Sequence, residues 1–397
     1  MTDDLSSYLD SVTVADLDRD PYPVYARLRR EAPVAHIPAV DTWFVTAYDD
    51  VAFVAEHPDL FPAEHGQSPV EITFGTPTLI TVDGPVHHDL RRSFDPNFRP
   101  RRVLQYIHDL VRPLAEEYAA GLVVGSEAEL MSEYFEPISV RSLAVVLGLG
   151  DVDVDTLRRW FHGMNLGATN FEHDPVKQAE ADAVCAEIDA VVVPRMERLR
   201  DKPDNSTMSH LLHAGAPAGR PREIDHVLPS LKVAILGGMQ EPGHAGGTVM
   251  CGLFAEPDQL ELVRGDPAAW VPSAVEEGLR WVAPIGTQFR TAAADVELGG
   301  TTIPSGSGVS AVLASANRDE SKFDDADRYD LHRVNRHQAA FGFGKHFCSG
   351  HSFARLQMQI AVEVLFVRHP SVRSHPEHPA SFRGWEFRAP GALPVLL

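Results

Sequence analysis

Apolar residues recur every three or four positions along much of the chain, a spacing that places them on one face of a helix. This pattern occurs in the segments PYPVYARLRR, RRVLQYIHDLVRPLAEEYAA, SVRSLAVVLGL and AEADAVCAEIDAVVVPRMERL. Strand-like segments are short, namely AHIPAV, TWFVTA and DVELGGTTIPSGSGVSAVL, and the Gly/Pro punctuation of the last predicts a hairpin. We therefore expect a mainly α fold with minor β structure.

An almost wholly apolar stretch from Val227 to Phe254 predicts a helix through the middle of the molecule. Pro242 has no N–H to donate to the carbonyl four residues earlier, so we expect a kink or an opened turn close to Gly238. Two interpretations remain open. Either one helix ends there and another begins, or the opened turn lies against a ligand that glycine allows to approach.

The charge of the chain excludes some partners. The 397 residues include 35 Lys and Arg against 56 Asp and Glu, a formal net charge of −21. Nucleic acids and anionic membranes bind clustered positive charge, so we expect neither. No stretch reaches the roughly 18 apolar residues of a membrane span, and the start, MTDDLSSYLD, is acidic where a signal peptide is basic. These features predict a cytoplasmic protein.

The three cysteines are far apart and have no metal-site spacing. Cys185 and Cys251 lie in apolar helical segments, and we interpret both as small buried residues. Cys348 differs because it ends the glycine-rich loop FGFGKHFCSG and directly precedes a helical pattern. A helix N-terminus stabilises a thiolate, so we expect a lowered thiol pKa at Cys348, as suits an axial iron ligand.

The segment FGFGKHFCSG resembles the heme loop of cytochrome P450 enzymes, FGxGxHxCxG, at every fixed position. The resemblance implies the P450 fold over residues 1–397 as one domain around heme b (iron protoporphyrin IX). It makes Cys348 the iron ligand and places Phe341 and His346 at the cofactor. Thiolate ligation donates electron density to the iron and favours O–O cleavage.

Two further motifs follow the family's order along the chain. Glu277 and Arg280 resemble its ExxR pair, three residues apart on one helix face. The later segment ANRDESKFDDADRYDLHR resembles its meander, and from it we expect Arg328 to complete a Glu-Arg-Arg cluster that supports the heme loop.

A separate set of cationic residues resembles the family's heme propionate clamp. His87 and Arg91 match an HxxxR motif, and Arg290 and His346 are expected to complete the clamp. Paired cationic donors form charge-assisted hydrogen bonds with carboxylates and so fix the orientation of the ring.

The central helix departs from the family pattern. Most members place an acid and a threonine where this chain has Gln240 and Glu241. Three interpretations compete: Glu241 delivers protons to dioxygen, Glu241 deprotonates peroxide, or the helix is degenerate and activity is lost. We favour the first, with peroxide use as a side activity.

The segment LGGMQEPGH resembles the guaiacol-type aromatic O-demethylase branch of the family, as do PYPVYARLRREAP, DLVRPLAEEY, EEGLRW and WEFRAP. On this resemblance the substrate pocket consists of Phe74, Val233, Gly237, Ile285 and Phe387. Phenylalanines can clamp a small planar ring, and glycine above the iron leaves room for a methoxy group.

Two positions depart from that branch and affect the substrate. Ala168 stands where the guaiacol enzymes have a further phenylalanine, which opens space for a second methoxy group, as in syringol, or for a larger ring substituent. After Ile285 the chain is one residue shorter, which leaves open how a para substituent fits.

The resemblance thus implies oxidative O-demethylation of a small methoxyphenol, such as syringol or guaiacol, with dioxygen. Because the chain has no flavin, dinucleotide or ferredoxin motif, electrons come from a separate partner. The resemblance implies an NADH-dependent iron-sulfur flavin reductase. The alternatives are hydroxylation of another small or natural-product substrate, and a heme carrier or sensor without turnover.

We expect the reductase to dock near Cys348 on a basic patch within an otherwise acidic protein. The patch consists of Arg91, Arg92, Arg101, Arg102, Lys345 and Arg355.

Overall fold

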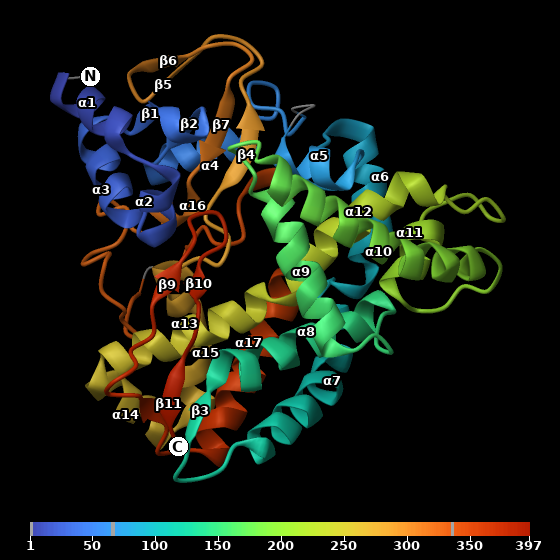
Figure 1. Cartoon of the computed structure of the whole chain (residues 1–397), viewed down its shortest axis with the longest axis vertical. Coiled ribbons are helices and arrows are strands. Elements are labelled where there is room, and N and C mark those ends of the chain that lie inside the picture. The colour runs from blue at the N-terminus through green and yellow to red at the C-terminus, as the bar shows by residue number, and fades with distance from the viewer. Residues whose placement is uncertain (1–2, 65–67, 335–336) are drawn as a thin grey trace.

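The computed structural model describes residues 3–64, 68–334 and 337–397. Figure 1 shows a helical body, with the first helices and a small sheet gathered at one side. The helices α13 (Glu241–Ala255), α15 (Pro267–Trp281) and α17 (His351–Arg368) cross the body. The mainly α architecture with minor β structure is as predicted.

The helices beside the sheet are short, and several pack into a separate apolar cluster around Tyr25 and Phe44. They are α1 (Asp3–Ser11), α2 (Val14–Arg19), α3 (Tyr22–Glu31), α4 (Tyr48–Glu56) and α16 (Leu313–Ala316). The short helix α5 (Pro69–Phe74) packs instead against the helical body.

The remaining helices form the helical body around the largest apolar cluster. They are α6 (Gly84–Phe94), α7 (Pro100–Gly121), α8 (Glu136–Leu147), α9 (Val154–Ala168), α10 (Pro175–Asp201), α11 (Thr207–His213), α12 (Ile224–Met239), α13 (Glu241–Ala255), α14 (Pro257–Gly265), α15 (Pro267–Trp281) and α17 (His351–Arg368).

The main sheet has the strand order β1-β2-β7-β4, with β2 and β7 parallel and the other pairs antiparallel. Its strands are β1 (Val34–Ile37), β2 (Thr42–Val45), β4 (Gln288–Thr291) and β7 (Gly308–Ala311). The predicted hairpin is present as the antiparallel pair β5 (Val296–Leu298) and β6 (Thr301–Ile303).

The other strands are short. All but β3 belong to the last part of the chain, and β3 pairs with β11. A three-stranded sheet has the order β3-β11-β8, and a two-stranded sheet pairs β9 with β10. Their bounds are β3 (Glu127–Glu129), β8 (Arg373–Ser374), β9 (Phe382–Arg383), β10 (Ala389–Pro390) and β11 (Pro394–Leu396).

The predicted interruption of the central helix is present. α12 ends at Met239 and α13 begins at Glu241, with Gln240 at φ −105° and ψ −30° between them. Pro242 lies at the start of α13, where its missing N–H costs nothing. A short π-helical segment, η3 (Met131–Phe135), packs against α13 and leads directly into α8.

Two absences concern possible partners. Within residues 3–64, 68–334 and 337–397, no helix combines the length and apolar character that crossing a bilayer requires. The same residues contain no group of three or more His, Cys, Asp and Glu side chains that could hold a metal ion.

Candidate active site

The loop that presents Cys348 requires glycine at two positions. Gly342 and Gly344 have φ values of 70° and 66°, in the left-handed region that glycine adopts without strain. A Cβ on Gly344 would lie 2.7 Å from the carbonyl oxygen of Ala55. The Cys348 N–H donates to the Phe341 carbonyl at 2.9 Å and closes the loop, so the backbone places the sulfur just before α17.

The expected lowering of the Cys348 pKa is wrong for the protein chain alone. Burial raises the pKa of the thiol, and this effect outweighs the hydrogen bond from the Gly350 N–H that lowers it. The helix N-terminus therefore does not by itself produce a thiolate. A metal ion bound to the sulfur would favour the thiolate.

Phe341 contributes to the packing that holds this loop in place. The Arg355 guanidinium lies 4.2 Å from the centre of the Phe341 ring, a cation–π contact. Arg355 also pairs with Glu276 at 2.6 Å and contacts the His351 ring nitrogen at 3.0 Å. One arginine thus ties the loop to α15 and α17.

Glu277 and Arg280 form the expected buried pair, with two hydrogen bonds of 2.7 and 2.8 Å. The third member is Arg333, whose Nε donates to Glu277 at 3.1 Å. The side chains of Glu277, Arg280 and Arg333 are 5%, 1% and 7% exposed, so these charges are compensated by each other rather than by water.

The prediction of Arg328 as third member is wrong. Its side chain is 58% exposed and pairs with Glu256 at 2.8 Å. The chain turns so that the backbone carbonyl of Arg328, not its guanidinium, faces the cluster and accepts from Arg280 and Arg333. The meander motif located the segment but not the residue, because the spacing within an irregular loop does not fix which side chain points inward.

His87, His346 and Arg290 converge as expected. The two imidazole rings lie 4.2 Å apart, and both nitrogens of buried His87 have no hydrogen-bond partner among the described residues. His346 Nδ1 and Arg290 Nη2 are likewise buried and unpartnered within that part of the chain. His346 Nε2 pairs with Asp83 at 3.0 Å, a residue that no sequence motif indicated.

The charge state of this group follows from burial and from the mutual arrangement of its members. Burial and the neighbouring His346 lower the pKa of His87 to about 4, and burial lowers that of Arg290 to about 10. Burial alone would raise the pKa of Asp83, but hydrogen bonds from His346 and the Ala63 N–H lower it to about 2. At neutral pH Arg290 supplies the positive charge and the imidazoles supply neutral donors, which suits an anionic group.

Arg91 has different partners from those expected. Its Nε pairs with Asp95 at 3.1 Å, and its Nη1 donates to the carbonyls of Phe347 at 3.0 Å and Lys345 at 3.4 Å. The side chain therefore braces the cysteine loop from α6. Contact of Arg91 with a propionate remains a prediction.

Gln240 and Glu241 stand at the break between α12 and α13. Both side chains are buried, and none of their four polar atoms has a hydrogen-bond partner among the described residues. Burial raises the pKa of Glu241 to about 7, so the carboxyl is poised to gain or lose a proton near neutral pH. The nearest ionisable atom that forms an ion pair with it is His244 Nδ1, at 4.0 Å.

Four of the predicted pocket residues lie on α12 and on the two segments that contain Ile285 and Phe387. Val233 and Gly237 are one turn apart on α12, and a Cβ added to Gly237 would meet no atom within 4 Å. Ile285 and Phe387 are joined by an antiparallel bridge. Phe387 also contacts Phe161, a residue that no sequence motif indicated, edge to face at 6.4 Å.

Phe74 and Ala168 are both buried, at the ends of α5 and α9. The residues just before them meet closely, since a Cβ on Gly167 would lie 2.5 Å from Thr73 Oγ1. The structure thus brings the two helix ends together.

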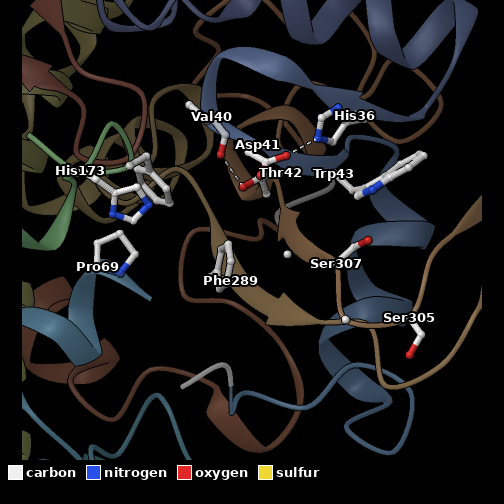
Figure 2. A pocket seen from close by; sticks show the side chains of 13 residues that line it. His36, Val40, Asp41, Thr42, Trp43, Pro69, His173, Phe289, Ser305 and Ser307 are labelled. Carbon is white, nitrogen blue, oxygen red and sulfur yellow. Dashed lines mark hydrogen bonds and ion pairs between the residues drawn. The ribbon is translucent and has the colours of Figure 1, made fainter. Parts of the chain in front are cut away.

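A separate cavity of about 420 Å³ lies outside this group, between the β1–β2 hairpin, Pro69 and β4 (Figure 2). Phe171 and Phe289 line it, and the Phe171 ring also contacts the Trp385 ring at a tilt of 45°, with centroids 5.3 Å apart. None of the six predicted pocket residues lines this cavity.

Comparison with known proteins identifies the family. The cytochrome P450 family model matches residues 270–379. The chain is 30% identical to 6-deoxyerythronolide B hydroxylase of Saccharopolyspora erythraea over 385 residues, covering 91% of this chain and 92% of that protein. It is 31% identical to the cytochrome P450 monooxygenase PikC of Streptomyces venezuelae, with coverages of 90% and 86%.

Solved structures agree. Cytochrome P450 CYP109Q5 from Chondromyces apiculatus superposes with a TM-score of 0.83 at 30% identity, over 95% of both chains. Cytochrome P450 CREJ in complex with (4-ethylphenyl) dihydrogen phosphate superposes with a TM-score of 0.86 at 25% identity, over 95% of this chain and 97% of that one. The chain therefore belongs to the cytochrome P450 family and is a heme-dependent monooxygenase that uses dioxygen and a separate redox partner.

The residues present fit heme b. Cys348 offers one sulfur ligand, and the unpartnered donors of His87, His346 and Arg290 can hold the two propionates. When bound, the heme supplies dioxygen activation and oxygen-atom insertion.

The predicted docking patch is only partly free of carboxylate partners. Arg91, Arg92 and Arg355 pair with Asp95, Asp89 and Glu276, each within 3.1 Å. Arg101, Arg102 and Lys345 are exposed. Reductase docking on this patch remains a prediction.

Proposed function

We propose that this monooxygenase removes a methyl group from a small methoxyphenol. The proposal rests on the resemblance of LGGMQEPGH and the pocket residues to the guaiacol-type branch. Its strongest structural support is the open space beside Gly237, on the same helix face as Val233. A methoxy group needs such space at the reacting centre.

The aromatic residues support a planar substrate. Phe387 and Phe161 meet edge to face at 90°, and Ile285 adjoins Phe387 through the backbone bridge. Rigid rings in this arrangement hold an aromatic ring by edge and face contacts. The structurally similar CREJ binds a para-substituted phenyl ester, so this fold accommodates a single ring of that kind.

The reaction is balanced with one dioxygen and one NADH. The methoxy C–H bond is oxidised to C–OH, which gives a hemiacetal. The hemiacetal breaks its C–O bond to release the phenol and formaldehyde, and the second oxygen atom leaves as water with two protons. In this scheme Glu241 holds and delivers protons at its carboxyl, while the apolar pocket excludes competing water.

Ala168 sets the preferred substrate in this proposal. It stands at the end of α9, on the helix that also carries Phe161. A methyl side chain in place of a phenyl ring leaves room for a second ortho methoxy group, so we propose syringol as the best substrate.

A second candidate is hydroxylation of a larger substrate. The relatives 6-deoxyerythronolide B hydroxylase and vitamin D(3) 25-hydroxylase, the latter 30% identical over 89% of this chain, favour it. This alternative predicts C–H hydroxylation with no release of formaldehyde.

The first test is a spectral titration of the ferric heme protein with syringol, guaiacol, catechol and para-alkyl guaiacols. A saturable low-spin to high-spin shift, tightest for syringol and absent for catechol, supports the proposal. A shift with macrolactone or sterol ligands and none with any methoxyphenol contradicts it and favours the second candidate.

A further inference from the structure

The buried carboxyl of Glu241 needs a route by which protons reach it from the solvent. Its side chain is 7% exposed, and neither carboxyl oxygen has a hydrogen-bond partner in the described part of the chain. A carboxyl that delivers a proton in each turnover must be reprotonated each time. Some neighbouring group therefore has to connect it to the solvent.

His244 lies between Glu241 and a second carboxylate. Its Nδ1 is 4.0 Å from Glu241 Oε1, and its Nε2 is 3.6 Å from Glu136 Oε1. Glu136 in turn pairs with Arg158 at 2.5 Å. A neutral imidazole accepts a proton on one nitrogen and donates one from the other, so a ring with a carboxylate at each nitrogen can pass a proton across.

The exposure of these side chains rises only at the outer end. In path order Glu241 is 7% exposed, His244 is 12% and Glu136 is 10%, so these three are similarly buried, and only Arg158, at 26%, is clearly more exposed. The two gaps at His244, 4.0 and 3.6 Å, exceed hydrogen-bond length, so transfer across each requires a bridging water or a small rotation of the ring. The series leads from the helix break to the surface of α9.

The fold holds His244 in this position by close packing. A Cβ on Gly243 would lie 2.9 Å from the Phe135 carbonyl oxygen and 3.1 Å from Glu136 Cα, so glycine lets α13 approach the start of α8. Phe161 packs edge to face on the His244 ring at 5.8 Å. The titratable side chain of His162 on α9 lies nearby and also interacts with Glu136.

We propose that His244 and Glu136 form the proton path that reprotonates Glu241. A proton from solvent near Arg158 passes through the Glu136 carboxylate to His244 Nε2, the His244 Nδ1–H bond breaks as a Glu241 O–H bond forms, and rotation of the ring restores the N–H at Nδ1 before the next transfer. This inference rests on the proposed role of Glu241 but not on the identity of the substrate. His244 and Glu136 are positioning residues that act through Glu241.

The test measures exchange of the Glu241 carboxyl proton in the heme-loaded protein without substrate. After mixing with D₂O, the infrared carbonyl band that Glu241→Gln abolishes is followed in time. We expect His244→Asn to slow the exchange at least about tenfold and Glu136→Gln to slow it as well. His210→Asn, on α11, is the matched control and should exchange at the wild-type rate.

Unchanged exchange in His244→Asn, with wild-type circular dichroism and heme content, overturns the path. If His244→Asn does not fold, unchanged exchange in Glu136→Gln does the same. Slowed exchange without methoxyphenol turnover leaves the path standing and contradicts only the proposed function. Turnover of methoxyphenols with unchanged exchange contradicts the path and leaves the proposed function standing.

Discussion

The cysteine side and the break in the central helix differ in how fully their polar groups are satisfied. On the cysteine side Glu277, Arg280 and Arg333 saturate one another, and Arg355 and Arg91 brace the loop. At the break, Gln240 and Glu241 are buried without a hydrogen-bond partner among the described residues. A saturated network rigidifies, whereas unsatisfied buried groups are costly and indicate a site that acts on something else.

The largest expected effect is at Cys348. Cys348→Ala removes the sulfur but keeps the backbone N–H that closes the loop, so we expect a folded protein with no monooxygenase turnover. The measurement is the spectrum of the reduced carbon monoxide complex, which should lose its thiolate-specific Soret position. Retention of that position would mean that another residue ligates the iron.

The next largest effect is expected in the cluster of Glu277, Arg280 and Arg333. Glu277→Gln leaves Arg280 and Arg333 buried without their counter-ion, and we expect a loss of about 3–5 kcal/mol in the free energy of unfolding. Arg328→Ala is the matched control and should cost less than about 1 kcal/mol, since its pair with Glu256 is exposed. Denaturant unfolding of both variants checks this, and equal losses would restore Arg328 to the cluster.

At the helix break we expect the reverse of the effect at Glu277. The charged carboxylate of Glu241 should destabilise the fold, because it is buried. Burial raises the pKa of Glu241 from 4.5 to about 7, so the folded protein binds this proton more tightly than the unfolded chain. The stabilisation of the fold that this proton binding provides is fully present below pH 4.5 and is lost as the pH rises to 7. Relative to Glu241→Gln, the wild type should lose roughly 3 kcal/mol over that window.

Unfolding free energies of the wild type and Glu241→Gln at pH 5 and pH 8 measure this difference. Burial also raises the pKa of Glu386 to about 7, but both proteins keep Glu386, so its contribution cancels. A difference that does not change with pH would mean that the Glu241 carboxyl is not desolvated in the heme protein.

The smallest expected effect is at Ala168. Ala168→Phe fills the space proposed for a second methoxy group, so we expect syringol binding to weaken by about 10–200-fold while guaiacol binding is retained. The ratio of the two dissociation constants from spin-state titrations measures this. An unchanged ratio would remove Ala168 from the pocket.

The sequence predicted the features that depend on local spacing. Cys348 and its two glycines lie within one short loop, Glu277 and Arg280 are one helical turn apart, and Pro242 marks the helix break. Arg333 was missed because an irregular loop decides which arginine turns inward. Asp83, Phe161 and the His244–Glu136 contact were missed because packing between distant segments creates them.

The central claim is that an aryl methoxy group reacts at this site. The most direct measurement is the product balance with syringol, dioxygen, NADH and a reductase. We predict one formaldehyde and one O-demethylated phenol for each substrate consumed. A hydroxylated product that keeps both methoxy groups, formed without formaldehyde, would contradict the claim.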